Sequence, residues 1–239
     1  MGILQSVTEK TKQLVEAEFD YTSTTDFNAI GSLNLDCTGI VMEATVIYLE
    51  INNIDFMLKT GKRLAARVYK IYYHILQEVC KATGGKLDCY SPKSFLLIYP
   101  KENFDETFVV DVAIKIASLL NVTLRETIEQ HSHVNFGIGV DHGNILGTKT
   151  NDESGSAHVA WFGHTIEKAI ALSHLSQRPF YVSVSRSVYH HLDDSLKTVT
   201  KNILGIKKEV SLWTRMSYVF DNTKKHLYQT NAQRSFNDE

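Results

Sequence analysis

The spacing of apolar and polar positions predicts the first elements of this chain. Residues 44–51 read as a strand in which Val46, Tyr48 and Glu50 point to one side. The side chains between them, at 45, 47, 49 and 51, form a mostly apolar second side. From residue 57 to 83, apolar positions recur at helical spacing and predict one long helix lying on a sheet. The glycine pair at 84–85 then ends this helix, because glycine accepts the left-handed conformation at a helix end.

The rest of the chain alternates short strands and amphipathic helices. The predicted strands cover residues 86–90, 94–99, 134–147 (as a strand pair), 159–162, 179–182 and 210–214, and the predicted helices cover residues 105–129, 163–175 and 185–192. The order strand, helix, strand, strand, helix, strand indicates an α+β fold, a ferredoxin-like split βαβ sheet with helices packed on one face. Many unrelated functions use this core, so the fold alone assigns none of them.

The two ends of the chain depart from this pattern. Residues 1–40 begin with apolar positions at helical spacing and continue as a stretch rich in Thr, Ser, Asn and Asp, so we expect an N-terminal arm. Residues 41–219 are expected to form the main domain. Residues 220–239 end in a run of polar side chains, which predicts a C-terminal tail without regular structure.

Composition excludes several classes of partner. The net charge of the 239 residues is −2, and the cations are scattered, so nucleic-acid binding is not expected. Lys59, Lys62, Arg63 and Arg67 gather at the start of the long helix, where a phosphate contact is possible and a solvated helix face is favoured. No apolar run approaches the ~20 residues that span a bilayer. The chain has only three cysteines, without CxxC spacing, which indicates a reducing cytoplasm rather than disulfides or a cysteine zinc site.

Three stretches, taken in order, resemble the class III adenylate and guanylate (nucleotidyl) cyclase domain. VIYLEINNIDF, at residues 46–56, resembles its strand and turn V-L-F-A-D-I-x-G-F/S-T. GGKLDCYSPKSFLLIYP, at 84–100, resembles its G-G hairpin, and VNFGIGVDHGNILG with VAWFGHTIEKAIALS, at 134–147 and 159–173, resembles its later strands and helix. The last segment is closest in character to the W-V-G-R-x-x-N-x-A-x-K-L pattern of anti-phage pyrimidine cyclases of bacteria. Diguanylate-cyclase palms are the main alternative.

The resemblance implies where catalytic groups would lie. Cyclases of this family hold two divalent metals, Mg²⁺ or Mn²⁺, with two carboxylates. The first position carries Glu50, which is longer than aspartate, and the second carries Lys93, a cation that removes a ligand. The positions that orient ribose and stabilise phosphate carry Glu167 and Ala171, and neither residue donates a hydrogen bond to phosphate. Glu50 is therefore either a remnant metal ligand or, as we favour, the partner of Lys93 on a neighbouring strand.

Further residues are candidates for a nucleotide pocket. The resemblance places base-selecting positions at Cys89 and His164, and neither matches a clear nucleobase rule. Tyr90 precedes the hairpin turn, as a tyrosine does in the pyrimidine cyclases. Trp161 is a further candidate, although a tryptophan on a short central strand is more often part of the core.

The sequence therefore predicts a catalytically impaired cyclase-like protein, without a required cofactor, that acts by dimerisation, ligand binding or partner docking in bacterial signalling or defence. Because class III cyclases build their sites between subunits, a homodimer would lack both halves of the site, whereas a heterodimer with an intact cyclase would not. One alternative is a divergent active cyclase that converts a nucleoside triphosphate to the cyclic monophosphate and pyrophosphate, with Glu50 as metal ligand. Another is an unrelated ferredoxin-like binding domain.

Overall fold

The computed structural model describes residues 2–33, 37–130, 133, 135–151, 157–203 and 206–236. The chain divides into two compact units. The smaller unit comprises Met1–Glu43 with Asn144–Gly163, and the larger unit comprises Ala44–Gly143 with His164–Glu239. The N-terminal segment, expected as an arm, thus forms one unit with a second segment from the middle of the chain.

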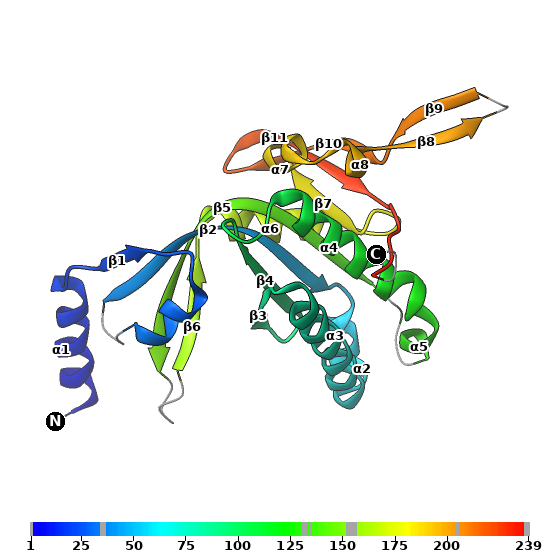
Figure 1. Cartoon of the computed structure of the whole chain (residues 1–239). Helices are drawn as coiled ribbons and strands as arrows, with labels where there is room; N and C mark the ends of the chain where they lie inside the picture. The colour runs from blue at the N-terminus through cyan, green and yellow to red at the C-terminus, as the bar shows by residue number, and fades with distance from the viewer. Residues whose placement is uncertain are drawn as a thin grey trace. The chain divides into compact units, whose positions relative to one another are not determined.

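The helices and strands are labelled in Figure 1. The smaller unit contains α1 (Ile3–Glu16), β1 (Asp20–Ser23), the 3-10 helix η1 (Phe27–Ser32) and β6 (Ala157–Phe162), and two long strands, β2 (Thr38–Ile51) and β5 (Phe136–Asn151), continue from it into the larger unit. The larger unit adds α2 (Ile54–Thr60), α3 (Lys62–Thr83), β3 (Lys86–Ser91), β4 (Ser94–Pro100), α4 (Glu106–Ser118), the π-helical turn η2 (Leu119–Thr123), α5 (Arg125–Glu129), α6 (His164–Leu175), β7 (Val182–Ser185), α7 (Arg186–His191), α8 (Asp194–Lys197), β8 (Thr198–Ile203), β9 (Ile206–Ser211), β10 (Trp213–Phe220) and β11 (Thr223–Thr230).

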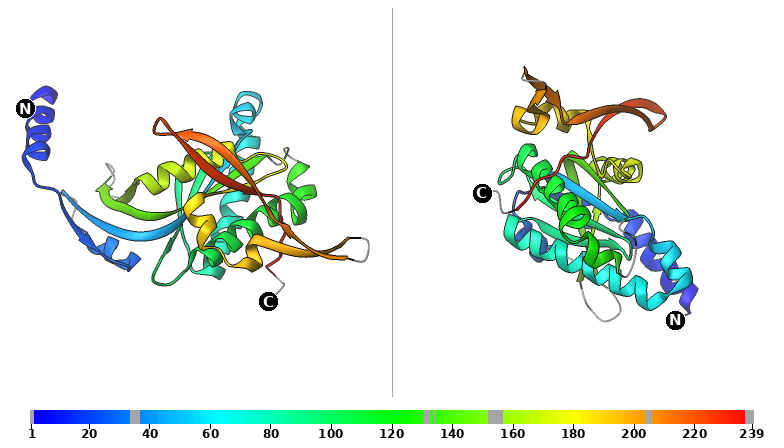
Figure 2. Two further views of the ribbon diagram at one scale, coloured as in Figure 1. Left: turned by 90° about the horizontal axis from the view of Figure 1, so that it is seen from above. Right: turned by 90° about the vertical axis from the view of Figure 1, so that its right-hand side faces the viewer.

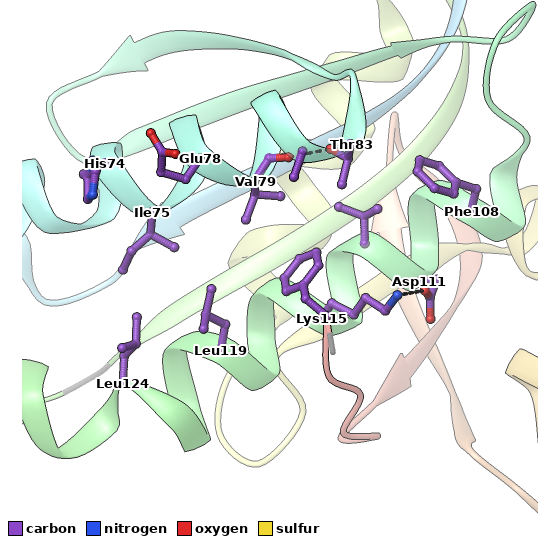
Figure 3. A pocket seen from close by; sticks show the side chains of 13 residues that line it. His74, Ile75, Glu78, Val79, Thr83, Phe108, Asp111, Lys115, Leu119 and Leu124 are labelled. Carbon is purple, nitrogen blue, oxygen red and sulfur yellow. Dashed lines mark hydrogen bonds and ion pairs between the residues drawn. The ribbon is translucent and has the colours of Figure 1, made fainter. Parts of the chain in front are cut away.

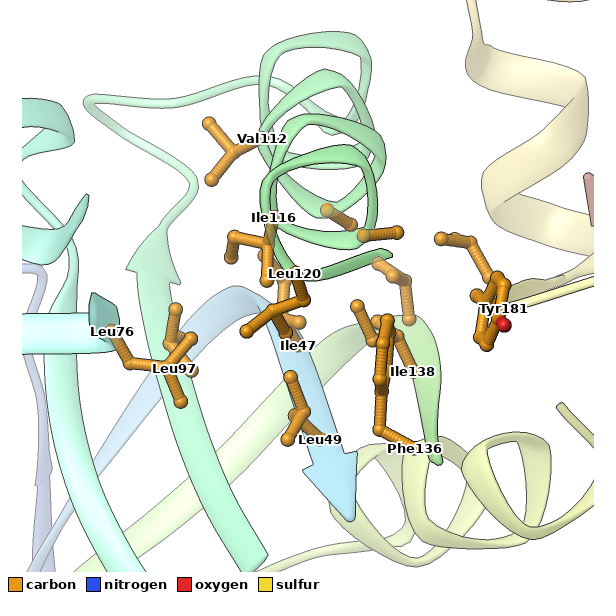
Figure 4. Packing of buried hydrophobic residues seen from close by; sticks show 14 of the residues in the cluster. Ile47, Leu49, Leu76, Leu97, Val112, Ile116, Leu120, Phe136, Ile138 and Tyr181 are labelled. Atoms are coloured by element: carbon orange, nitrogen blue, oxygen red, sulfur yellow. The ribbon is translucent and has the colours of Figure 1, made fainter. Parts of the chain in front are cut away.

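The main sheet of the larger unit has the strand order β10-β11-β7-β5-β2-β4-β3. β2 and β4 are antiparallel, whereas β5 and β7 are parallel. One face of this sheet carries apolar side chains such as Ile47, Leu49 and Leu97, which pack with Leu76 of α3 and Ile116 of α4 (Figure 4). This arrangement confirms the predicted α+β fold with helices packed against a sheet.

α6 covers the opposite face of the sheet (Figure 2). It lies so close to β5 that a Cβ atom on Gly139 would be 1.9 Å from the carbonyl oxygen of Ala169, and one on Gly137 would be 2.1 Å from that of Ser173. Glycine at both positions therefore lets the helix backbone rest directly on the strand. Glu50 points toward this second face, because side chains alternate along β2 and those of Ile47 and Leu49 point to the first face.

Several predicted boundaries were wrong, for local reasons. The long helix is broken at Gly61, whose extended backbone (φ −168°, ψ 92°) ends α2 before α3 begins. The helix predicted over 105–129 divides into α4, η2 and α5. The strand pair predicted at 134–147 is one strand, β5, which continues through Gly143 at a φ of 153° that favours glycine. The strand predicted over 179–182 begins instead at Val182.

The predicted polar tail is also corrected. Residues 223–230 form β11, which pairs with β10 on one side and with β7 on the other. Asp221 and Asn222, with φ values of 49° and 56°, make the two-residue turn before it, because these side chains tolerate the left-handed region. The strand predicted at 210–214 is wrong as well, since β9 ends at Ser211 and β10 begins at Trp213.

The smaller unit has its own packing. The predicted N-terminal helix is confirmed as α1, whose apolar side chains, including Leu4 and Val7, are exposed. β1 runs parallel to the beginning of β2, and β6 runs antiparallel to the end of β5. Throughout the described parts of both units, no helix is long and apolar enough to cross a membrane.

Candidate functional site

The end of β2 places Glu50 beside the turn that joins β3 and β4. Glu50 is opposite Ser94 in the β2–β4 register, and the amide of Ile51 donates to the carbonyl oxygen of Lys93 at 2.8 Å. The turn is closed by a 2.6 Å hydrogen bond between the hydroxyl groups of Ser91 and Ser94. The backbone thus brings Lys93 next to Glu50, whose side chain is only 10% exposed.

The Lys93 ammonium lies between two carboxylates. Its Nζ is 3.1 Å from Oε1 of Glu50 and 3.5 Å from Oδ2 of Asp55, in the first turn of α2. The hydrogen bond with Glu50 raises the pKa of Lys93 above its ordinary value, so the side chain is charged at neutral pH. The predicted pairing of Glu50 with Lys93 is confirmed.

The second oxygen of Glu50 is also occupied. Nε2 of His174, on α6, lies 2.6 Å from Oε2 of Glu50. His174 shares one face of α6 with Glu167 and Ala171, because positions 167, 171 and 174 follow helical spacing. Asp55, Lys93, Glu50 and His174 therefore form one chain of contacts, which we call the Glu50 cluster.

His164 lies at the start of α6 between two carboxylates of its own chain. Its Nδ1 is 3.6 Å from Glu167, and its Nε2 is 3.3 Å from Asp221, at the β10–β11 turn. The ring also meets the edge of Phe220 at a centroid distance of 5.0 Å. The side chains of His164, Glu167 and Asp221 are all more than half exposed, so their charge interactions are screened by water.

Comparison with known proteins identifies the fold. No family sequence model matches the chain, and no curated protein is significantly similar to it in sequence. The guanylyl cyclase Cya2 superimposes with a TM-score of 0.65 at 10% identity, over 84% of this chain and 97% of that one. A class III adenylyl cyclase-like ATP-binding protein from Pseudomonas aeruginosa gives 0.62 at 13% identity, over 80% of this chain and 43% of that one. The non-canonical dimeric guanylyl cyclase domain of the RhoGC fusion protein from the aquatic fungus Blastocladiella emersonii gives 0.56 at 14% identity, over 81% of this chain and 98% of that one.

The chain has the fold of a class III nucleotide cyclase catalytic domain. Within this cyclase fold, the Glu50 cluster does not suit a pair of divalent metals. One oxygen of Glu50 faces an ammonium group, the other faces His174, and the position expected for a second carboxylate is Lys93 itself. Among the residues that the structure describes, no group of three or more His, Cys, Asp and Glu side chains is arranged to hold a metal ion.

Cys89 and Tyr90, two of the candidates for a nucleotide pocket, both lie on β3. Cys89 is exposed on β3, where the pairing register shifts between Asp88 and Ser91. Burial and a hydrogen bond with Cys89 raise the pKa of Tyr69 to about 12, so its phenol is neutral at ordinary pH. Tyr90 lies in the same irregular stretch, and its side chain is outside the described residues.

Trp161 belongs to the smaller unit of the cyclase fold. It is 5% exposed, and its ring meets Phe27 edge to face at a centroid distance of 6.3 Å. A Cβ atom on Gly147 of the neighbouring strand would lie 2.8 Å from this ring. Trp161 is therefore a core residue of that unit, which is the alternative that the sequence favours.

Two residues near α6 were not singled out from the sequence. His174 is one helical turn beyond Ala171, so its spacing could have placed it on the same face. Asp141, on β5, is completely buried, and Nζ of Lys168 lies 3.6 Å from its Oδ2. Burial raises the pKa of Asp141 despite this nearby cation.

Proposed function

We propose that this chain is a catalytically impaired class III cyclase-like protein that acts through dimerisation, ligand binding or partner docking. The observation that supports the proposal is the position of Lys93, whose ammonium lies within 3.5 Å of both Glu50 and Asp55. In a cyclase site, carboxylates at the positions of Glu50 and Lys93 would hold the divalent metals. Lys93 supplies a covalently attached positive charge there, and a metal would have to displace it and meet its repulsion.

The consequences for catalysis are large. Cyclisation relies on metal ions to lower the pKa of the attacking ribose hydroxyl and to neutralise the phosphates. Removal of one electrostatic donor alone typically costs about 10²–10³ in rate. Glu167 and Ala171 add two further losses at the positions where phosphate and ribose would be held. We therefore expect no useful turnover from this chain by itself.

The ligand of such a protein would be a nucleotide bound without chemistry. Its cyclase-like fold and the likeness to a cyclase-like ATP-binding protein support this part of the proposal. The role in bacterial signalling or defence is supported by the resemblance of residues 160–172 to the anti-phage pyrimidine cyclases. A genomic neighbour encoding an intact cyclase or an effector would identify the partner.

Metal binding by a charge-reversal variant tests the proposal. Mn²⁺ titrations monitored by electron paramagnetic resonance should show that Lys93→Asp binds the ion at least about tenfold more tightly than the wild type. The control is Lys225→Asp, which makes the same charge change at an exposed position of β11 and should leave Mn²⁺ affinity unchanged. Tight Mn²⁺ binding by the wild type that Glu50→Ala abolishes would contradict the proposal and favour the divergent active cyclase.

A further inference from the structure

A cavity of about 670 Å³ lies between α3 and α4 (Figure 3). It is on the face of the sheet opposite to Glu50, so it is separate from the Glu50 cluster. Most of its lining is apolar, from Ile75, Val79, Phe108, Val112, Leu119 and Leu124. Its volume is within the range of ~300–1,000 Å³ typical of binding pockets.

The chain's own C-terminal segment already places an aromatic ring in this cavity. Phe236 is part of the lining, and Nζ of Lys115 lies 5.6 Å from the centre of its ring. The segment is held on α4 by Arg234, whose amide donates to Oγ of Ser118 at 3.0 Å and whose Nε lies 2.9 Å from Asp111. The seating of Phe236 shows that a short peptide segment with an aromatic side chain fits between these helices.

A basic surface continues along α3 from the same cavity. A shallow groove is lined by Arg63, Ala66, Arg67, Lys70, Ile71 and His74, and we call this set the basic stripe. His74 lines both the groove and the cavity, so the two are adjacent. No acidic residue occurs from 56 to 77, whereas the whole chain has a net charge of −2. The first carboxylate beyond this stretch, Glu78, is paired with Lys81 at 2.6 Å.

The basic stripe and the apolar cavity beside it together favour one kind of partner. Cations at positions 63, 67 and 70 fall on one side of a helix and attract an acidic segment. The apolar cavity at the end of the stripe accepts a hydrophobic anchor. The chain's own last residues, Phe-Asn-Asp-Glu, join an aromatic residue to two acids, although residues 237–239 are outside the described part of the structure. Duplex nucleic acid fits less well, because the chain as a whole is acidic and the lining of the cavity is mostly apolar.

We propose that α3 and α4 form a docking site for an acidic peptide segment of a partner protein that carries an aromatic anchor. The anchor enters the cavity, and the acidic side chains lie along the basic stripe. In the free chain Phe236 occupies the place of the anchor, and a partner has to displace it. This inference concerns a different face from the Glu50 cluster and does not depend on the loss of catalysis.

Peptide binding to the full-length chain tests the proposal. The probe is a fluorescent synthetic peptide, TNAQRSFNDE, that copies residues 230–239. The full-length Phe236→Ala variant should bind it at least about tenfold more tightly than the wild type, because its own anchor no longer competes. A peptide with alanine in place of its phenylalanine should lose at least about tenfold in affinity for the same variant.

Charge reversal on the stripe provides the second arm. Adding Arg63→Glu and Lys70→Glu to the Phe236→Ala chain should weaken peptide binding by about tenfold or more, and increasingly so at low salt. The matched control is Lys224→Glu with Lys225→Glu, two exposed cations on β11 whose reversal should change nothing. Far-UV circular dichroism checks that every variant is folded.

Three results would overturn the inference. They are no binding to Phe236→Ala at up to about 1 mM peptide, binding that ignores both the aromatic residue and the stripe, and tighter binding of a duplex oligonucleotide than of the peptide. If Phe236→Ala does not fold, a peptide with a photoreactive benzoylphenylalanine anchor tests the wild-type chain. Crosslinks should then map to α3 and α4, and crosslinks confined to other elements would overturn the inference.

Discussion

We expect the buried carboxylate of Asp141 to make the stability of the larger unit depend on pH. The side chain is fully buried on β5 beneath α6, and burial raises its pKa above the ordinary value of 3.8. Between that ordinary value and the raised value, the folded chain binds more protons than the unfolded chain. The stability contribution of Asp141 is therefore fully present below about pH 3.8 and is lost as the pH rises through the raised pKa.

The variant Asp141→Asn removes this titration while keeping the shape of the side chain. We expect the free energy of unfolding of the variant, relative to the wild type, to increase as the pH is raised from 4 toward 7. Urea unfolding at several pH values measures this difference. The exposed Asp20→Asn variant serves as the control. A relative stability that stays constant or falls with rising pH would show that burial does not raise the pKa of Asp141.

Individual contacts of the Glu50 cluster differ in how far the sequence predicts them. The pair of Glu50 and Lys93 follows from two neighbouring strands and their opposite charges. His174 could not be assigned as a partner in this way, because it is 124 residues from Glu50 and reaches it only once α6 lies on the sheet. For Cys89 and His164, sequence similarity gives a position, whereas their actual neighbours, Tyr69 and Asp221, depend on tertiary packing.

Among the elements, α6 is the one whose packing depends most directly on glycine, at two positions of β5. The helix backbone contacts β5 at Gly137 and Gly139, and this close approach brings His174 to Glu50 and Lys168 to Asp141. Any side chain at these two glycines would push the helix away from the strand. The geometry of both charged contacts is therefore set by two positions that carry no functional group.

Gly139→Ala tests this packing. The added Cβ would lie 1.9 Å from the carbonyl oxygen of Ala169, a backbone atom that cannot rotate away. Overpacking of this kind typically costs about 1–3 kcal/mol, and we expect a loss at or above the upper end. Gly31→Ala is the control, because a Cβ there meets nothing within 4 Å. Equal unfolding midpoints in urea for the two variants would contradict the proposed packing.

The strands after residue 197 show the limit of prediction for elements. β8 and β9 form a separate two-stranded sheet, and β9 is almost entirely exposed, so its residues lack the alternation of a half-buried strand. β11 begins with the exposed residues Thr223, Lys224 and Lys225, and its buried residues lie only in its second half, where it pairs with β7. By contrast, the end of α3 and the β3–β4 hairpin were predicted closely, because Gly84 ends the apolar stripe of the helix and β4 is buried along its whole length.

At the scale of the whole molecule, self-association is one of the three modes of action in the proposed function. One guanylyl cyclase domain of similar fold is described as a non-canonical dimer, and the family that the sequence resembles builds its sites between subunits. We expect the purified chain to sediment as a dimer at micromolar concentrations in an analytical ultracentrifuge. A monomer that binds neither nucleotide nor the acidic peptide would leave the proposed function without a mechanism.

The most direct test of the loss of catalysis is an assay for product. The purified chain is incubated with Mg²⁺ or Mn²⁺ and each of the four nucleoside triphosphates, and cyclic nucleotides are measured by mass spectrometry. We predict no cyclic product above the level of a Glu50→Ala control, because Lys93 stands in place of the second metal-binding carboxylate and its ammonium pairs with Glu50. Clear turnover by the wild type that Glu50→Ala abolishes would contradict this prediction.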